Sequence, residues 1–272
     1  MIPLIRRLML TGLLALSCGG PVLAGEEGFG GIVLADDGRA ALLHAPGTAR
    51  LALLRDGRLW PVPDLGLGRI GRVFPLQGGW IGFDRDAGGG TRLFHLDADA
   101  EQVLCHVPVT DHETADMDLR DGLAYLAAAD GSRITVVNVA SMPGNCPEAQ
   151  GGPERSGIDV NAAPPVRILV DPVANMALLL DASGGVVTAD LQGGKMPLRA
   201  VATRSPGPVE IALTAGPSGE AVAYLALIAD QLVQVWQLDS DFRELRQSGL
   251  IALADLAATK APYVVAAGPI VS

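Results

Sequence analysis

The chain has 272 residues, a formal net charge of −10 and 49% apolar residues. This is enough apolar material for a folded core and excludes a disordered chain. Lysine occurs only as Lys195 and Lys260, so the chain lacks the clustered basic residues that nucleic acids and anionic membrane surfaces require. Glycine (34) and proline (19) are frequent, which is typical of a protein with many turns.

The first 24 residues have the pattern of an export signal. Arg6 and Arg7 precede an apolar run at 8–16, and Ala24 ends a stretch of small and medium residues that suits signal peptidase. The apolar run is too short for a stable membrane anchor. We therefore expect residues 1–24 to be removed.

The mature chain, residues 25–272, is expected to be periplasmic or secreted, and no later segment is long and apolar enough to span a membrane. Two alternatives for its export remain open. One is a lipid anchor at Cys18, and the other is a twin-arginine signal built on Arg6 and Arg7.

Paired apolar runs recur along the mature chain, each pair joined by a glycine-containing or polar turn. When Leu51, Leu93, Ile134, Val186 and Val233 are taken as equivalent, the intervals are 42, 41, 52 and 47 residues. Such regular spacing indicates a repeat protein. The first runs of the pairs are 39–47, 80–89, 123–131, 176–185 and 222–230, and the second runs are 49–57, 91–99, 132–140, 185–193 and 231–239.

Further strand-like runs flank most pairs, so that a unit holds four short strands, the pattern of a β-propeller blade. The inner runs are almost wholly apolar because a strand between stacked blades is buried on both faces. The sequence thus predicts an all-β fold in one domain. A partial unit at 249–268 favours six blades with an incomplete last blade, and the alternative is five blades with a C-terminal extension.

The hairpins "LAYLAAADGSRITVVNVA" (123–140) and "MALLLDASGGVVTADL" (176–191) resemble the repeats of YVTN-type bacterial β-propellers. In these repeats an aromatic and aliphatic run is followed by a glycine turn and a second aliphatic run that ends in Asp or Asn. The resemblance covers most of the mature chain and implies the propeller fold without any particular activity. The chain departs from it in having few aromatic residues in the repeats.

Two cysteines remain after removal of the signal, Cys105 and Cys146. An even pair in an oxidising compartment predicts one disulfide. Cys146 lies in the single long insertion, 141–165, which is rich in Pro, Gly and polar residues and is predicted to be a loop. Tied down by a disulfide, this loop is a candidate for binding a partner, and the alternative is a tolerated insertion.

The densest polar cluster lies at 105–118. Its residues Asp111, His112, Asp116 and Asp118 carry imidazole and carboxylate groups that would suit a divalent metal ion. The alternative is a solvated acidic loop.

Acidic residues also recur where the first strand of a unit turns into the second. On a propeller these residues would surround one mouth of the central channel and could gather a cation or a basic peptide, although Asp is also a common turn residue. They are Asp36, Asp121, Asp171 and Asp255.

No catalytic set of nucleophile and base can be identified, and no cofactor is predicted apart from the alternative of a divalent metal. The sequence therefore favours an exported β-propeller that acts as a protein-binding or assembly module. Its expected partner is another envelope protein, within an envelope or redox complex. The alternative is a small metal-dependent enzyme of the lactonase or hydrolase kind, with its site at the channel mouth.

Overall fold

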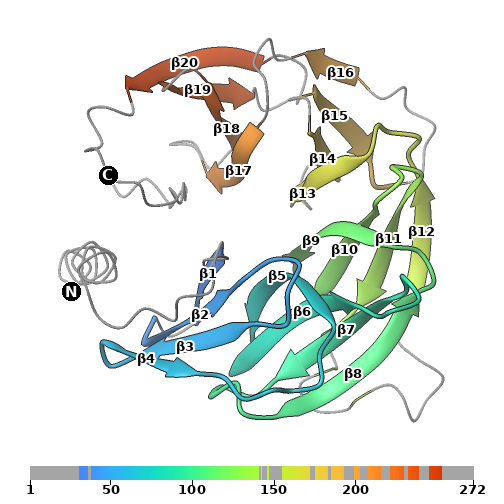
Figure 1. The fold of residues 1–272 in the computed structure, drawn as a ribbon. Coiled ribbons are helices and arrows are strands. Elements are labelled where there is room, and N and C mark those ends of the chain that lie inside the picture. Colours follow the sequence, from blue (N-terminus) through green and yellow to red (C-terminus); the bar gives the residue numbers. More distant parts are fainter. Residues whose placement is uncertain are drawn as a thin grey trace.

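The computed structural model of the chain is all-β and has the β-propeller fold, with four-stranded antiparallel sheets arranged around a common centre (Figure 1). It describes backbone and side chains at 31–35, 38–140, 142, 146, 156–171, 175–182 and 185–192, together with the backbone of residue 155 and of strands at 199–202, 208–215, 221–229, 232–238 and 245–252. Among the described residues there is no helix long and apolar enough to cross a membrane.

Within the described ranges there are five sheets, each formed by four strands in chain order. The first sheet contains β1 (Gly31–Leu34), β2 (Ala40–His44), β3 (Leu51–Arg55) and β4 (Arg58–Pro61). The second contains β5 (Arg69–Leu76), β6 (Gly79–Arg85), β7 (Thr91–Leu96) and β8 (Val103–Thr110). The third contains β9 (Thr114–Arg120), β10 (Leu123–Ala128), β11 (Arg133–Asn138) and β12 (Arg155–Asp159). The fourth contains β13 (Pro165–Asp171), β14 (Met176–Asp181), β15 (Gly185–Asp190) and β16 (Arg199–Ala202), and the fifth contains β17 (Pro208–Ala215), β18 (Ala221–Ala229), β19 (Leu232–Leu238) and β20 (Leu245–Ala252).

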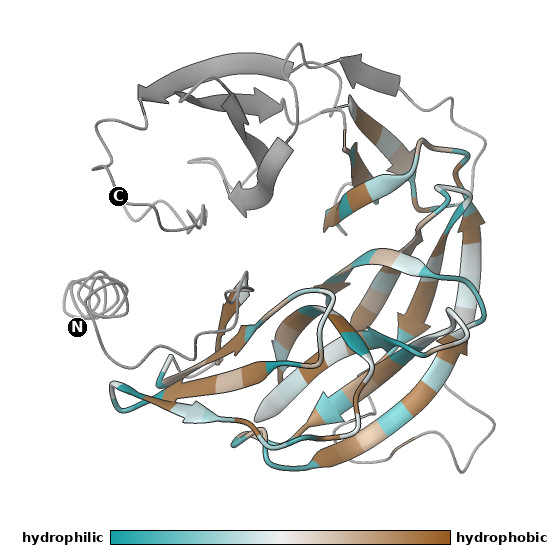
Figure 2. Ribbon diagram, in the orientation of Figure 1, coloured by the Kyte–Doolittle hydropathy of each residue, from teal (hydrophilic) through white to brown (hydrophobic). Residues whose placement is uncertain are grey.

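Successive sheets stack face to face, which explains the unbroken apolar runs of the sequence. In β10, Ala124 and Leu126 belong to the core shared with the second sheet, whereas Tyr125 and Ala127 belong to the core shared with the fourth. A strand with a neighbour on each face buries both faces, so its hydropathy does not alternate between apolar and polar positions. Figure 2 shows the hydrophobic colouring gathered on the strands and the hydrophilic colouring at many of the turns.

The first strand of each sheet lies toward the centre and the last lies at the rim (Figure 1). The first strands also contact one another in sequence, β1 with β5, β5 with β9, β9 with β13 and β13 with β17. The centre of the molecule is therefore lined by side chains from consecutive sheets.

The structure differs from the prediction in the segment 141–165, because β12 (Arg155–Asp159) pairs with β11 there and completes the third sheet. The segment is therefore not a loop throughout. The start of the predicted sixth unit, at 249, is the second half of β20, the last strand of the fifth sheet. The rest of that unit lies outside the described residues, so six blades with an incomplete last blade stay a prediction.

Candidate functional site: a groove between the second and third sheets

A groove of about 900 Å³ lies between the outer strands of the second and third sheets. It brings together the two segments that the sequence singles out, the polar cluster at 105–118 and the segment 141–165. Its lining is polar and poor in large side chains. The lining residues are Asp86, Gly88, Gly90, Pro108, Val109, Thr110, Asp111, His112, Arg133, Thr135, Ser156 and Gly157.

One end of the groove is shaped by the turn between β6 and β7. The Oδ1 atom of Asp86 accepts hydrogen bonds from the backbone amides of Gly88 (2.8 Å) and Gly90 (2.9 Å). Between them Gly89 has a φ of 86°, in the left-handed region that glycine adopts without strain. The carboxylate of Asp86 therefore fixes the turn and adds a negative charge to the groove.

The two walls are formed by edge strands. β8 is the last strand of the second sheet and β12 is the last strand of the third. Edge strands leave backbone hydrogen-bonding groups unpaired along one side. Pro108 on β8 has no amide hydrogen to offer an added strand, whereas Ser156 and Gly157 on β12 each have one. Because successive residues of an antiparallel strand turn their amides to opposite sides, one of these two faces β11 and the other faces the free edge.

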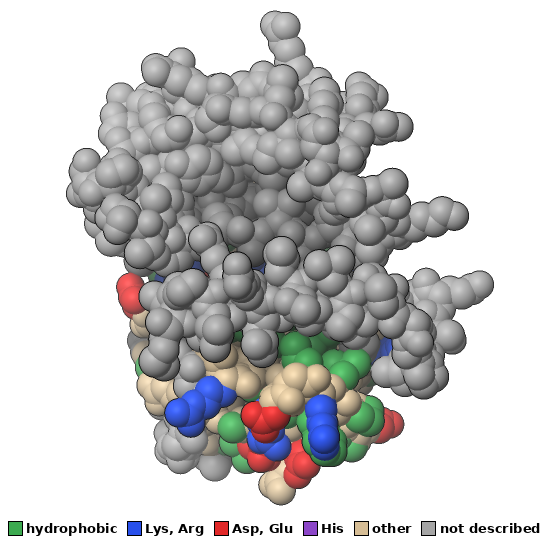
Figure 3. Space-filling view, turned by 90° about the vertical axis from the view of Figure 1, so that its left-hand side faces the viewer, with side chains coloured by type: hydrophobic (Ala, Val, Ile, Leu, Met, Phe, Trp, Pro, Cys, Tyr) green, Lys and Arg blue, Asp and Glu red, His purple; other side chains and the backbone are tan. Residues whose placement is uncertain are grey.

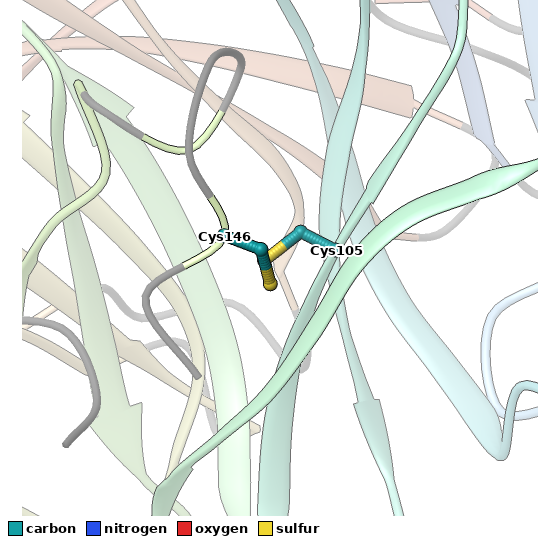
Figure 4. Close-up of a disulfide and its surroundings, with 2 residues drawn as sticks. All are labelled: Cys105 and Cys146. Atoms are coloured by element: carbon teal, nitrogen blue, oxygen red, sulfur yellow. A yellow bond between two sulfur atoms is a disulfide. The ribbon is translucent and has the colours of Figure 1, made fainter. Parts of the chain in front are cut away.

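A disulfide joins the parts of the chain that form the two walls. Cys105, on β8, is bonded to Cys146, which precedes β12, with a Cα–Cα distance of 5.2 Å (Figure 4). Cys105 is buried in the core between the second and third sheets, and Cys146 packs against that core. The bridge thus links the second sheet covalently to the segment leading into β12, and its retention in the exported protein stays a prediction.

The charges of the groove are predominantly negative. Asp86 and Asp111 line it, and Arg133 is ion-paired with Asp159 at 3.3 Å. The Asp and Arg side chains of the lining therefore carry two negative charges and one positive charge, and Asp159, which pairs with Arg133 outside the lining, adds a third negative charge nearby. An acidic surface attracts basic ligands.

Of the four predicted metal ligands, only two lie at the groove. The side chains of Asp111 and His112 are 92% and 52% exposed, with 3.4 Å between Oδ1 and Nε2. Asp116 and Asp118 are buried on β9. Within the described part of the chain, no group of three or more His, Cys, Asp or Glu side chains is arranged to hold a metal ion. The structure therefore does not bring the four residues to one point.

Asp116 and Asp118 instead bind the backbone of the neighbouring sheet. Asp116 accepts the amide of Ile168 at 3.0 Å, and Asp118 accepts the amide of Val170 at 2.8 Å. Burial raises the pKa of Asp118, outweighing the charge of Arg120 and the hydrogen bond from Val170, both of which lower it. We refer to these two contacts between β9 and β13 as the carboxylate seam.

The predicted ring of channel-mouth acids is only partly described. Asp121 lies exposed in the turn between β9 and β10, with a φ of 50°. Asp171 lies at the end of β13 and is buried. Asp36 and Asp255 lie outside the described residues, so the ring itself stays a prediction.

A second buried cluster surrounds Asp84 on β6, and the sequence did not identify it. Arg92 donates to the Asp84 carboxylate from Nε (3.2 Å) and Nη2 (2.7 Å), and His106 Nε2 lies 3.0 Å from Oδ1. The amide of Gly68 also donates to Asp84. Burial by itself would raise the pKa of Asp84, but the hydrogen bonds from His106, Arg92 and Gly68 outweigh it and hold the pKa below its usual value.

His106 belongs to the Asp84 cluster and is not part of the groove lining. His106 points to the face of the second sheet that carries Asp84, and the same carboxylate fixes the connection from the first sheet through Gly68. The available sequence signal was an acidic residue, Asp84, inside the apolar run 80–89. A buried charge in such a strand needs partners, and here they come from β7, β8 and the preceding connection.

Surface charges elsewhere are mixed rather than segregated. On the described part of the face drawn in Figure 3, acidic and basic side chains lie next to one another. The exposed ion pair between Arg55 and Asp99 is one example of such pairing. The acidic groove therefore differs from this mixed surface.

Comparison with known proteins supports the fold alone. No model of a known protein family matches the chain, and no curated protein matches it in sequence. Among solved structures, a "putative 6-phosphogluconolactonase" from Bacteroides fragilis is similar with a TM-score of 0.58 and 12% identity, over 81% of this chain and 70% of that one. A protein of the same description from Bacteroides uniformis has a TM-score of 0.56 and 15% identity, over 80% and 70% of the chains. A functionally unknown protein from Desulfotomaculum acetoxidans has a TM-score of 0.56 and 11% identity, over 85% and 72%.

Proposed function

We propose that the protein is an exported β-propeller that binds a basic, extended segment of another envelope protein in the groove between β8 and β12. The observation that carries this proposal is the meeting of two edge strands in one groove of net negative charge. A segment rich in Lys or Arg would gain electrostatic attraction there, and charge complementarity raises both association rate and specificity.

The shape of the groove favours an extended segment. Glycine and small hydroxyl side chains at Gly90, Gly157, Thr135 and Ser156 leave room for a polypeptide backbone close to the walls. An added strand can hydrogen-bond to an exposed sheet edge. We expect it to pair with β12, because Pro108 removes an amide donor from β8.

The export of the chain and its place in an envelope complex are part of the same proposal. They are supported by the N-terminal pattern at 1–24 and by the suitability of Cys105 and Cys146 for an oxidising compartment. A disulfide between the two walls would also keep the groove in a binding-competent shape, which lowers the entropic cost of association.

A labelled ten-residue peptide of alternating Lys and Thr tests the groove directly. Fluorescence anisotropy should show binding to the purified protein that weakens as salt is raised. Asp111→Lys should weaken this binding at least tenfold, because its exposed carboxylate lies in the groove lining. The matched control is Glu101→Lys, the same charge change in the turn between β7 and β8 at the opposite end of β8, and it should bind as the wild type does. Equal loss in both variants would refute the assignment of the site.

A photo-crosslinking amino acid at Ser156 tests the native partner. In living cells it should capture one envelope protein, and the crosslink should disappear when Asp111→Lys is added. The same amino acid at Glu101 serves as the control position. Capture with equal yield from both positions would show non-specific contact and would count against a partner in the groove.

The alternative proposal is a metal-dependent lactonase or hydrolase. Its metal ligands would include Asp111, His112, Asp116 or Asp118, of which the structure places two at the groove and two in the carboxylate seam. The similar solved structures share 11–15% identity with this chain and carry the fold alone. Stoichiometric metal in the purified protein, together with destabilisation by a chelator, would favour the enzyme over the binding module.

A further inference from the structure

Gly157 lies inside β12, the rim strand of the third sheet, although the fold does not require a glycine there. The five residue pairs between β11 and β12 follow one another without a shift in register, so Gly157 does not form a β-bulge. Its φ lies outside the left-handed region, and the nearest atoms to an added Cβ would be those of the Arg133 side chain, at 3.6 Å or more. A side chain would therefore fit. Glycine inside a strand weakens it and, where it forms no bulge, often marks a place that a ligand or another backbone approaches closely.

The backbone of Gly157 offers hydrogen bonds to the free edge of β12. The amide of Val160 donates to the carbonyl of Ser132 at 2.9 Å, so at Val160 the backbone groups turn toward β11. Successive residues of an antiparallel strand turn these groups to opposite sides. Asp159 and Gly157, one and three residues before Val160, therefore direct their amides and carbonyls away from β11. β12 is the last strand of its sheet, so an added strand can bond to both residues.

The face of β12 that carries Gly157 is turned toward the second sheet. Gly157 is directly opposite Thr135 on β11, and residues directly opposite each other project to the same face. Val137, two residues from Thr135, belongs to the core shared with the second sheet. In an added strand, the residue directly opposite Gly157 therefore projects its side chain into the groove, of which Gly157 is a lining residue. Gly157 has no side chain to occupy that space.

The Arg133 side chain indicates which residue would fit opposite Gly157. Its Nη2, Cζ and Nε atoms are 3.6, 3.7 and 3.9 Å from the position of a Cβ atom on Gly157, so the guanidinium lies beside the bare backbone of the glycine. Nη2 is also 3.3 Å from Asp159 Oδ1, and the Arg133 side chain remains 41% exposed. A guanidinium stacks on aromatic rings, and an aromatic ring on a neighbouring strand can cover an exposed glycine. An aromatic side chain would meet both conditions.

We propose that the segment bound in the groove pairs antiparallel with β12 and places an aromatic residue directly opposite Gly157. The inference rests on the proposed binding of a basic, extended segment and names the residue that anchors it. The aromatic ring covers Gly157 and stacks on the guanidinium of Arg133, while a basic residue two positions along lies opposite the 85% exposed carboxylate of Asp159. Opposite charges directly across a strand pair attract. The antiparallel direction is that of every pair of neighbouring strands in the third sheet.

Fluorescence anisotropy with three labelled nine-residue peptides tests the proposal. The reference peptide alternates Lys and Thr with Lys at its centre, and the second has Trp in place of the central Lys. The third exchanges this Trp with the next Thr, which keeps the composition but moves the ring to the other face of the strand. The Trp-centred peptide should bind at least tenfold more tightly than the other two. If no peptide binds, the groove proposal fails and this inference with it. If the reference peptide binds but the Trp-centred peptide binds no more tightly than the shifted one, only the aromatic anchor is refuted.

Methylation of single peptide amides tests the pairing with β12 without altering the protein. In an antiparallel pair, directly opposite residues whose backbone groups face each other exchange two hydrogen bonds. An N-methyl group on the central Trp removes the donor to the Gly157 carbonyl and should weaken binding at least tenfold. An N-methyl group on the following Thr, whose amide points away from β12, should leave binding within threefold. Equal effects of the two methyl groups would overturn the pairing.

Two arginine variants test the contact of the ring with Arg133. Arg133→Gln should reduce the advantage of the Trp-centred peptide over the shifted peptide to less than threefold. Arg55→Gln is the matched control, because Arg55 is 45% exposed and also pairs with an aspartate but lies on β3 in the first sheet, and it should keep the full advantage. Equal loss in the two variants would overturn the stacking on Arg133. The methylated peptides are measured on the wild-type protein, so they test the proposal even where a variant fails to fold.

Discussion

The buried imidazole of His44 makes the stability of the protein sensitive to mild acid. In the unfolded chain the ring takes up a proton near its ordinary pKa of 6.5, whereas in the folded protein it does so only near 4. Between these values the unfolded state binds more protons, so stability falls as pH is lowered from 6.5 to about 4. Above pH 6.5 the ring is neutral in both states and this contribution is complete.

The size of the effect follows from the shift. One pKa unit corresponds to about 1.4 kcal/mol, so a fall from 6.5 to about 4 corresponds to about 3 kcal/mol of unfolding free energy lost over this range. That is a large part of the stability of an ordinary domain. The loss should therefore be visible well before the carboxylates of the protein are fully protonated.

Urea denaturation of the wild type and of His44→Gln at intervals from pH 7.5 to pH 4 measures this effect. The variant should start less stable at pH 7.5 but should lose about 3 kcal/mol less than the wild type on acidification. His112→Gln, which removes an exposed imidazole, is the matched control for the loss of a histidine. If the wild type and His44→Gln lose the same free energy between pH 6.5 and pH 4, the burial of a neutral His44 is refuted.

Three further predictions concern stability at neutral pH, measured by urea or thermal denaturation. Asp116→Ala should lower the unfolding free energy by about 1–3 kcal/mol, because it leaves a buried amide of β13 without an acceptor, and Asp116→Asn should cost less because it keeps an acceptor; equal losses would contradict this. Under oxidising conditions Cys105→Ala should lower the unfolding free energy by about 4 kcal/mol, from the loop entropy of a 41-residue separation. In a reductant that opens the bridge in the wild type, the variant and the wild type should be equally stable. Gly131→Ala should cost more than Gly57→Ala, since both have a positive φ but only at Gly131 would the new Cβ meet a backbone oxygen, at 2.2 Å; similar losses would show that backbone strain alone decides.

The hairpins of the propeller were predictable because their signal is local. The run 123–140 contains β10 and β11, joined at Asp130 and Gly131, as the turn chemistry indicates. β12 was missed because its residues, Arg155–Asp159, include a glycine, a serine and two charged residues at the rim of the sheet. A strand that buries little apolar surface has little hydrophobic pattern to detect.

The roles of the acidic residues were not predictable, because they depend on partners far along the chain. The alternation of Asp116 and Asp118 with Met117 is visible in the sequence, and it places both acids on one face of a strand. The amides that donate to these carboxylates, those of Ile168 and Val170, lie 52 residues later and come close only when the third and fourth sheets stack. The residue types at 105–118 suggested that these carboxylates bind a metal ion, whereas in the fold they bind backbone amide hydrogens.

The carboxylate seam also fixes how the third and fourth sheets align. Asp116 and Asp118 accept hydrogen bonds from two amides of β13 that are likewise two residues apart. A shift of β13 by one residue relative to β9 would turn both amides away from the carboxylates. The third and fourth sheets can therefore stack at this boundary in one register only. The chain connection between the two sheets does not have to set that register.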